Sequence, residues 1–125
     1  IMKAIETKTA PAAIGPYSQA MVYGGLVYTS GQIPVVPETG NVVGDSIEAQ
    51  AEQSCKNVGA ILAASGTGYE HVIKTTCFLA DMNDFAAFNA VYEKYFVSKP
   101  ARSCVAVKTL PKNVKCEIEA IAEIV

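Results

Sequence analysis

The 125-residue chain contains one arginine, Arg102, against nine lysines. Lysine suffices where positive charge serves solubility alone, whereas the planar guanidinium of arginine can hold a carboxylate or a phosphate through two parallel hydrogen bonds. Arg102 stands in a short apolar segment, on the same predicted strand face as Cys104 and Ala106. The alternative is a structural ion pair with Glu117 or Glu119 across a sheet. The residue types alone leave both interpretations open.

Glu117 and Glu119 are two residues apart in the last segment of the chain, so a strand would place both side chains on one face. Paired carboxylates can serve as general acid and base. Glutamates on a strand face are more often solvated or ion-paired, and Glu123 on the same face illustrates that ordinary role. Cys104 has no general base near it in the sequence, so we interpret it as a buried thiol rather than a nucleophile.

Two loops could present polar groups to a ligand. Residues 15–18 and residues 30–32 lie at the two ends of the first predicted hairpin, and their glycine and proline content is typical of turns. Ser30 and Gly31 can also offer a hydroxyl and a backbone amide to a small polar molecule. The trio at residues 66–68 lacks the flanking strand and helix of a dinucleotide site and is interpreted as a linker.

Composition excludes several classes of protein. His71 is the only histidine, and the four cysteines contain no CxxC pair, so neither a zinc site nor a disulfide framework is expected. A net charge of −2 gives no general attraction for nucleic acid. Half of the residues are hydrophobic, which indicates a folded chain. No apolar run approaches the roughly 20 residues of a membrane span and no signal peptide is evident, so we expect a soluble cytoplasmic protein.

The elements that must position these residues follow from hydrophobic periodicity. Asp45 or Ser46 is expected to cap a first helix that ends before Gly66, and Asp84 to cap a second helix that ends at Lys99 and Pro100. Residues 31–44 are predicted to form the longest loop. Strands are predicted over residues 2–7, 20–23, 26–30, 71–80, 102–107 and 114–124, with Gly24 and Gly25 closing a hairpin between the second and third.

The order β-β-β-α-β-α-β-β predicts an α+β fold, a two-layer sandwich with one mixed sheet and two helices on one of its faces. We expect residues 1–125 to form a single domain. The other sheet face is predicted to carry Tyr28, Cys104 and Ile121 and has no helix to cover it. Symmetric self-association would cover that face, so a homo-oligomer is expected.

Six segments together resemble one known family, the RidA family of small enamine/imine deaminases. PARSC followed by EIEAIA, with GPYSQ upstream, is its most specific combination. The resemblance extends from residue 10 to residue 124 and rests on APAAIGPYSQA (10–20), TSGQIP (29–34), NVGAIL (57–62), KTTCFLADMNDFAAFNAVY (74–92), PARSCVAV (100–107) and LPKNVKCEIEAIA (110–122).

The resemblance implies a chorismate-mutase-like fold of the bacillus type and a homotrimer with sites in the clefts between subunits. It also implies hydrolysis of 2-aminoacrylate, 2-aminocrotonate and their 2-imino acid tautomers to 2-oxo acids and ammonia, without metal or organic cofactor. Pyridoxal-phosphate-dependent serine and threonine dehydratases would supply these substrates. Arg102 would bind the substrate carboxylate and Glu117 would hold the attacking water. The pocket would be lined by Tyr17, Ser30, Gly31, Asn89 and Cys104.

One segment departs from the family pattern. In the family the connection before PARS is longer and places an aromatic residue before the proline, whereas here the second helix leads through residues 97–99 directly to Pro100. Lys99 in this position can favour a second anionic group on the substrate or simply face solvent.

Two other functions remain as alternatives. The first is a non-catalytic trimeric module that binds 2-oxo acids or other small carboxylates, for which Glu117 would be dispensable. The second is an RNA-cleaving translation inhibitor, an activity of some relatives. Lys108, Lys112 and Lys115 gather near one end of the chain, but the net charge of −2 argues against it.

Overall fold

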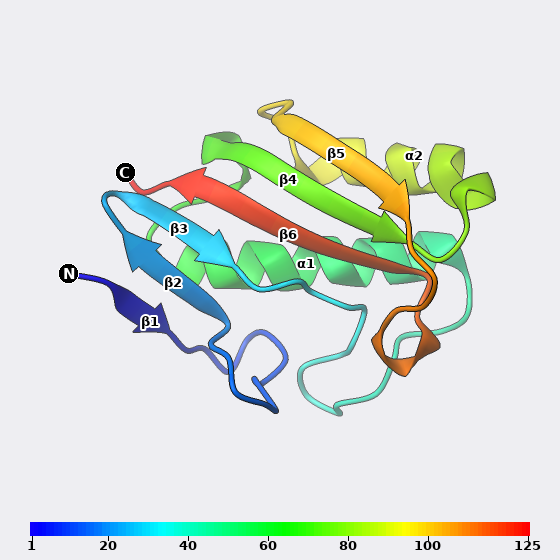
Figure 1. The fold of residues 1–125 in the computed structure, drawn as a ribbon, viewed down its shortest axis with the longest axis horizontal. Helices are drawn as coiled ribbons and strands as arrows, with labels where there is room; N and C mark the ends of the chain where they lie inside the picture. Colours follow the sequence, from blue (N-terminus) through cyan, green and yellow to red (C-terminus); the bar gives the residue numbers. More distant parts are fainter.

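Six strands form one mixed sheet in the computed structural model, which describes residues 1–125 (Figure 1). The spatial order of the strands is β1-β2-β3-β6-β4-β5, and only β4 and β5 run parallel. Both helices cover the same face of this sheet (Figure 1). This is the predicted α+β arrangement. The strand bounds are β1 (Lys3–Ile5), β2 (Ala20–Tyr23), β3 (Leu26–Thr29), β4 (Val72–Leu79), β5 (Ala101–Ala106) and β6 (Cys116–Glu123).

The hairpin between β2 and β3 has the predicted two-residue turn. Gly24 and Gly25 have φ values of 62° and 80°, in the left-handed region that favours glycine. Two consecutive left-handed residues are the requirement of a type I′ turn, whose twist matches that of the strands it joins. The hairpin is therefore confirmed, and residues 31–44 follow it as an irregular loop without helix or strand.

Helix α1 (Ile47–Ala64) agrees closely with its predicted bounds. The hydroxyl of Ser46 accepts a hydrogen bond from the backbone N–H of Ala49 at 3.1 Å, which makes Ser46 the N-cap. Gly66 follows the helix with φ of 86°. The apolar residues that recur every three or four positions are all buried, namely Ile47, Ala51, Cys55, Val58, Ile61 and Leu62.

The second helix begins where predicted, with Asp84 at its N-cap position, but it ends earlier than predicted. Helix α2 (Phe85–Tyr95) follows a 3₁₀ turn, and the Asp84 side chain makes no capping hydrogen bond. The Asp81 carboxylate instead accepts from the N–H of Asn83 at 2.9 Å, so the chain has already turned before Asp84 is reached. The helix ends at Tyr95 rather than at Lys99, because Phe96 leaves the helical conformation and is buried against Tyr92.

The sheet has one covered and one open face. In β6, the even-numbered residues 116–122 are buried towards the helices, whereas Glu117, Glu119 and Ile121 are half-buried on the opposite side, as predicted. Tyr28 pairs with Ile121 on that open face. Cys104 was predicted there too, but that prediction is wrong, because its register partner is the buried Cys77 on the helix side. Neither helix has the length and apolar character needed to cross a membrane.

Candidate functional site

Arg102 lies on the helix side of β5 against helix α2. Its Nη1 donates a hydrogen bond to Asn89 Oδ1 at 2.7 Å. Its Cζ lies 4.8 Å from the ring centroid of Tyr92 and 5.4 Å from that of Phe85. Both distances are within the range of a cation–π contact. Side chains from α2 thus hold the guanidinium at one nitrogen and against two aromatic rings.

Arg102 has no acidic partner. The ion pairs of the chain join Glu52 to Lys56 and Glu70 to His71, both far from Arg102 in the sequence. The alternative that Arg102 pairs with a glutamate of the last strand is therefore wrong for this chain. Nε and Nη2 donate no hydrogen bond, which leaves the side-on edge of the guanidinium free. That edge has the geometry for two parallel hydrogen bonds to a carboxylate.

A cavity of about 580 Å³ opens beside Arg102. The Lys99 side chain lies at its wall although the residue is exposed, and no acidic group ion-pairs with it. Lys99 has φ of 52°, in the left-handed region, within the short connection between α2 and β5. The cavity is lined by Asn89, Tyr92, Glu93, Phe96, Val97, Lys99, Pro100 and Arg102.

Glu117 lies on the open side of β6, next to the loop that follows β3. The loop is fixed there by two hydrogen bonds, from Gln32 N–H to the Ile118 carbonyl at 2.7 Å and from Ile118 N–H to the Gln32 carbonyl at 3.1 Å. A Cβ added to Gly31 would approach Glu117 Cδ to 2.8 Å. A side chain at position 31 would therefore displace the Glu117 carboxyl group from this position. The Gly31 N–H donates no hydrogen bond within the chain.

The Glu117 carboxyl group has the properties of a weakened acid. Burial raises the pKa of Glu117 above its ordinary value, and the neighbouring Glu119 carboxylate raises it further. No cation is within ion-pairing distance of either glutamate. A carboxylate with a raised pKa is a stronger base, so Glu117 is suited to accept a proton from water.

Ser30 and Cys104 were also predicted to line the pocket. The Ser30 hydroxyl donates to the Ser18 carbonyl at 2.6 Å, so its proton is already engaged. Cys104 is half-buried near Arg102; burial raises the pKa of its thiol, and Arg102 only partly offsets this effect. Cys104 is therefore suited to line a pocket as a thiol, in agreement with its interpretation as a residue other than a nucleophile.

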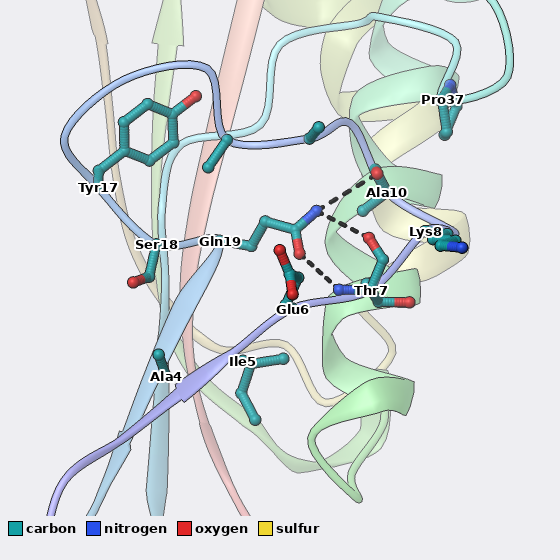
Figure 2. A pocket seen from close by; sticks show the side chains of 12 residues that line it. Ala4, Ile5, Glu6, Thr7, Lys8, Ala10, Tyr17, Ser18, Gln19 and Pro37 are labelled. Carbon is teal, nitrogen blue, oxygen red and sulfur yellow. Dashed lines mark hydrogen bonds between the residues drawn. The ribbon is translucent and has the colours of Figure 1, made fainter.

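Tyr17 borders a separate and larger cavity of about 770 Å³ (Figure 2). In Figure 2 the Tyr17 ring stands on the loop, while the Gln19 side chain crosses towards Thr7 and Ala10. Gln19 is buried, accepts from the Thr7 N–H at 2.7 Å, and donates to the carbonyls of Thr7, Ala10 and Pro11. Gln19 belongs to the GPYSQ segment, but its residue type and spacing did not mark it as a functional candidate. Its amide holds the loop that carries Tyr17.

The structure separates Arg102 from Glu117. Arg102 is in register with Thr75, whose other partner is Ala120, and that row of side chains faces the helices. Glu117 is in register with Phe78 on the opposite face. Side chains of directly paired residues share one side of a sheet. One copy of the chain therefore cannot bring the guanidinium and the carboxylate to the same small molecule.

The chain is similar to known proteins along almost its whole length. The family model described as endoribonuclease L-PSP matches residues 7–124. The 2-iminobutanoate/2-iminopropanoate deaminase of Salmonella typhimurium is 56% identical over 124 residues, which cover 96% of each chain. A crystal structure of TdcF from E. coli with bound serine superposes with a TM-score of 0.93 at 50% identity, covering 98% of this chain and 99% of the other. The structure of yeast Mmf1 has a TM-score of 0.96 at 48% identity, with full coverage of both chains.

Proposed function

The chain belongs to the endoribonuclease L-PSP family, which is the RidA family, and on that premise we propose that it is an enamine/imine deaminase. Its substrates would be 2-aminoacrylate, 2-aminocrotonate and their 2-imino acid tautomers, and its products 2-oxo acids and ammonia. A relative that is 56% identical along nearly its whole length is named for this activity. The proposal extends to residues 1–125 as one domain of this kind.

The observation that carries the proposal is the unpaired guanidinium of Arg102. A half-buried cation held by Asn89 and two aromatic rings, with its bidentate edge free, is suited to a carboxylate ligand. Every substrate named above carries a carboxylate beside the reacting carbon. Binding at Arg102 would therefore place that carbon at a fixed distance from the guanidinium. The serine bound to TdcF is also a small molecule with a carboxylate.

The chemistry needs few further groups, because a protonated imine is already an electrophile. A water molecule held by Glu117 gives one proton to the Glu117 carboxylate while the water oxygen attacks the imine carbon, and a carbinolamine forms. The protonated Glu117 then returns that proton to the amino group, and collapse of the carbinolamine, with loss of its hydroxyl proton to the Glu117 carboxylate, expels ammonia and leaves the 2-oxo acid. Such general base action contributes on the order of a hundredfold or more. The free N–H of Gly31 beside Glu117 is suited to bind an oxygen of the reacting molecule.

We further propose that the site is shared between copies in a homotrimer with the chorismate-mutase-like arrangement. One copy would supply Arg102, Asn89 and Cys104, and its neighbour would supply Tyr17, Ser30, Gly31 and Glu117. The location of Arg102 and Glu117 on opposite sheet faces supports this division. The open face, with Tyr28 and Ile121, supplies apolar surface for the contact. Light scattering at micromolar concentration should give about three times the chain mass of 13.2 kDa; a monomer mass would contradict the shared site.

Elimination of water from serine or threonine produces these substrates. Pyridoxal-phosphate-dependent dehydratases perform that step, and we propose a functional link to them in the cytoplasm. No metal or organic cofactor is required by the mechanism above, because the electrophile, the base and the carboxylate-binding group are all present in substrate and side chains.

A coupled assay tests the activity. Threonine dehydratase releases the imine, and 2-oxobutanoate is followed with and without this protein; faster appearance is expected with the wild type. Glu117→Gln should lose most of this acceleration while still binding 2-oxobutanoate by calorimetry. Binding without acceleration by the wild type would favour the binding module. Cleavage of RNA by the wild type in place of imine hydrolysis would favour the translation-inhibitor alternative.

A further inference from the structure

Tyr92 connects Arg102 to the middle of the sheet. Its ring centroid lies 4.8 Å from Arg102 Cζ, and its hydroxyl lies 2.6 Å from Thr75 Oγ1 in the core. Thr75 is 1% exposed and Tyr92 is 8% exposed. Thr75 is also the register partner of Arg102 on the neighbouring strand. Tyr92 on α2 therefore contacts one side chain of β4 and one of β5.

Core packing alone does not account for this pair of hydroxyls. Valine has nearly the shape of threonine and phenylalanine nearly that of tyrosine, so an apolar pair could fill the same space. Two buried hydroxyls are costly to desolvate and return little net stability when they bond only to each other. The hydrogen bond between the two hydroxyls instead fixes the orientation of the Tyr92 ring, because it holds the ring at its hydroxyl end. Phe96 stacks on the same ring, with centroids 4.5 Å apart and planes at 21°.

We propose that Tyr92, anchored by Thr75, is a positioning residue that holds the guanidinium of Arg102 in the plane that accepts the substrate carboxylate; this inference rests on the proposed function. Asn89 fixes one nitrogen of the guanidinium but leaves the group free to pivot about that hydrogen bond. The Tyr92 and Phe85 rings limit the pivot by contact with the group itself. The edge with Nε and Nη2 is then presented in one orientation before the ligand arrives.

The expected effects differ between two substitutions of the same residue. Tyr92→Leu removes the ring, and a cation–π contact of ordinary strength corresponds to a weakening of carboxylate binding of about 3- to 30-fold. Tyr92→Phe keeps the ring and loses only the anchor, so a loss of about 2- to 5-fold is expected. Because the carboxylate is bound alike in the ground and transition states, KM should rise with little change in kcat.

The chain provides matched controls. Tyr95 lies on the same helix, and its hydroxyl donates to Glu52 at 3.0 Å, away from Arg102. The Tyr69 hydroxyl is half-buried and donates to the Cys55 carbonyl at 2.7 Å. Tyr95→Phe and Tyr69→Phe each remove one tyrosine hydroxyl bond and should leave the Kd for 2-oxobutanoate within twofold of the wild type.

A double-mutant cycle read by calorimetry with 2-oxobutanoate tests the inference. Tyr92→Leu should weaken binding in the wild type and have no further effect in the Arg102→Lys background, because Tyr92 acts through the guanidinium. Equal losses in both backgrounds, or no loss in the wild type, would overturn the proposal. If Tyr92→Leu does not fold, Tyr92→Phe and Thr75→Val provide the same comparison. Absence of imine hydrolysis by a wild type that binds 2-oxobutanoate would refute the proposed reaction alone; a wild type that does not bind it would overturn both.

Discussion

Mixing two inactive variants should restore activity if each site takes residues from two copies. Arg102→Ala removes the carboxylate-binding group, and Glu117→Gln removes the base. Neither residue takes part in an ion pair within the chain, so neither substitution leaves a buried charge without its partner. Arg102 and Glu117 lie on opposite faces of one sheet, so the two substitutions damage different halves of a shared site.

The expected recovery follows from counting. In a cyclic oligomer assembled at random from equal amounts of both variants, a complete site needs an intact Arg102 from one copy and an intact Glu117 from the next. Each condition holds for half of the copies, so about a quarter of the sites are complete. The mixture should therefore show about a quarter of the wild-type activity per chain. If both residues came from one chain, every site would lack one of them and no recovery would occur.

The assay is the coupled formation of 2-oxobutanoate, with the variants refolded together or produced in the same cells so that mixed oligomers form. Each variant assayed alone gives the background activity. Variants that are assembled separately and then mixed show whether subunits exchange between finished oligomers. Activity no higher than the sum of the separate variants, in samples shown to contain mixed oligomers, would refute the shared site and with it the interpretation of the two sheet faces.

Further predictions concern single substitutions and metal removal. Arg102→Lys keeps the charge but loses the bidentate edge, so the Kd for 2-oxobutanoate should rise and turnover at low substrate concentration, measured as kcat/KM, should fall, each about 10- to 100-fold or more; unchanged calorimetry would contradict this role. Burial raises the folded-state pKa of Glu117 above its ordinary 4.5. The contribution of Glu117 to the free energy of unfolding is therefore fully present below pH 4.5 and is lost as pH rises through the raised pKa. Urea titrations should show Glu117→Gln gaining stability relative to wild type from about pH 4.5 upwards, and a stability difference that does not vary with pH would exclude the shift. Gly31→Ala should displace the Glu117 carboxyl and lower kcat about tenfold or more with a smaller change in 2-oxobutanoate binding. Exhaustive chelation should leave imine hydrolysis unchanged, whereas loss of activity that zinc restores would show that the reaction depends on a metal.

Local patterns were sufficient to predict most of the fold. The double glycine at residues 24–25 fixes the hairpin turn, and the apolar repeat from Ile47 to Leu62 fixes the buried face of α1. The strict alternation of β6 correctly predicted that Glu117 faces away from the helices. These features depend on residues close in sequence, which is why they can be read from it. The C-terminal end of α2 could not, because the packing of Phe96 against Tyr92 ends the helix at Tyr95.

The tertiary structure decided how the candidate residues are grouped. β5 is an edge strand whose residues are all at least partly exposed. Its composition therefore does not indicate whether the Arg102 side chain lies on the helix-covered face of the sheet or on the open face. The parallel register with β4 settles this, and strand register is a contact between segments distant in the chain. The same holds for the approach of Gly31 to Glu117 and for the contact of Tyr92 with both Thr75 and Arg102. The sequence by itself determined which residue types are available for carboxylate chemistry, whereas the pairing of the strands determined which of them one molecule can use together.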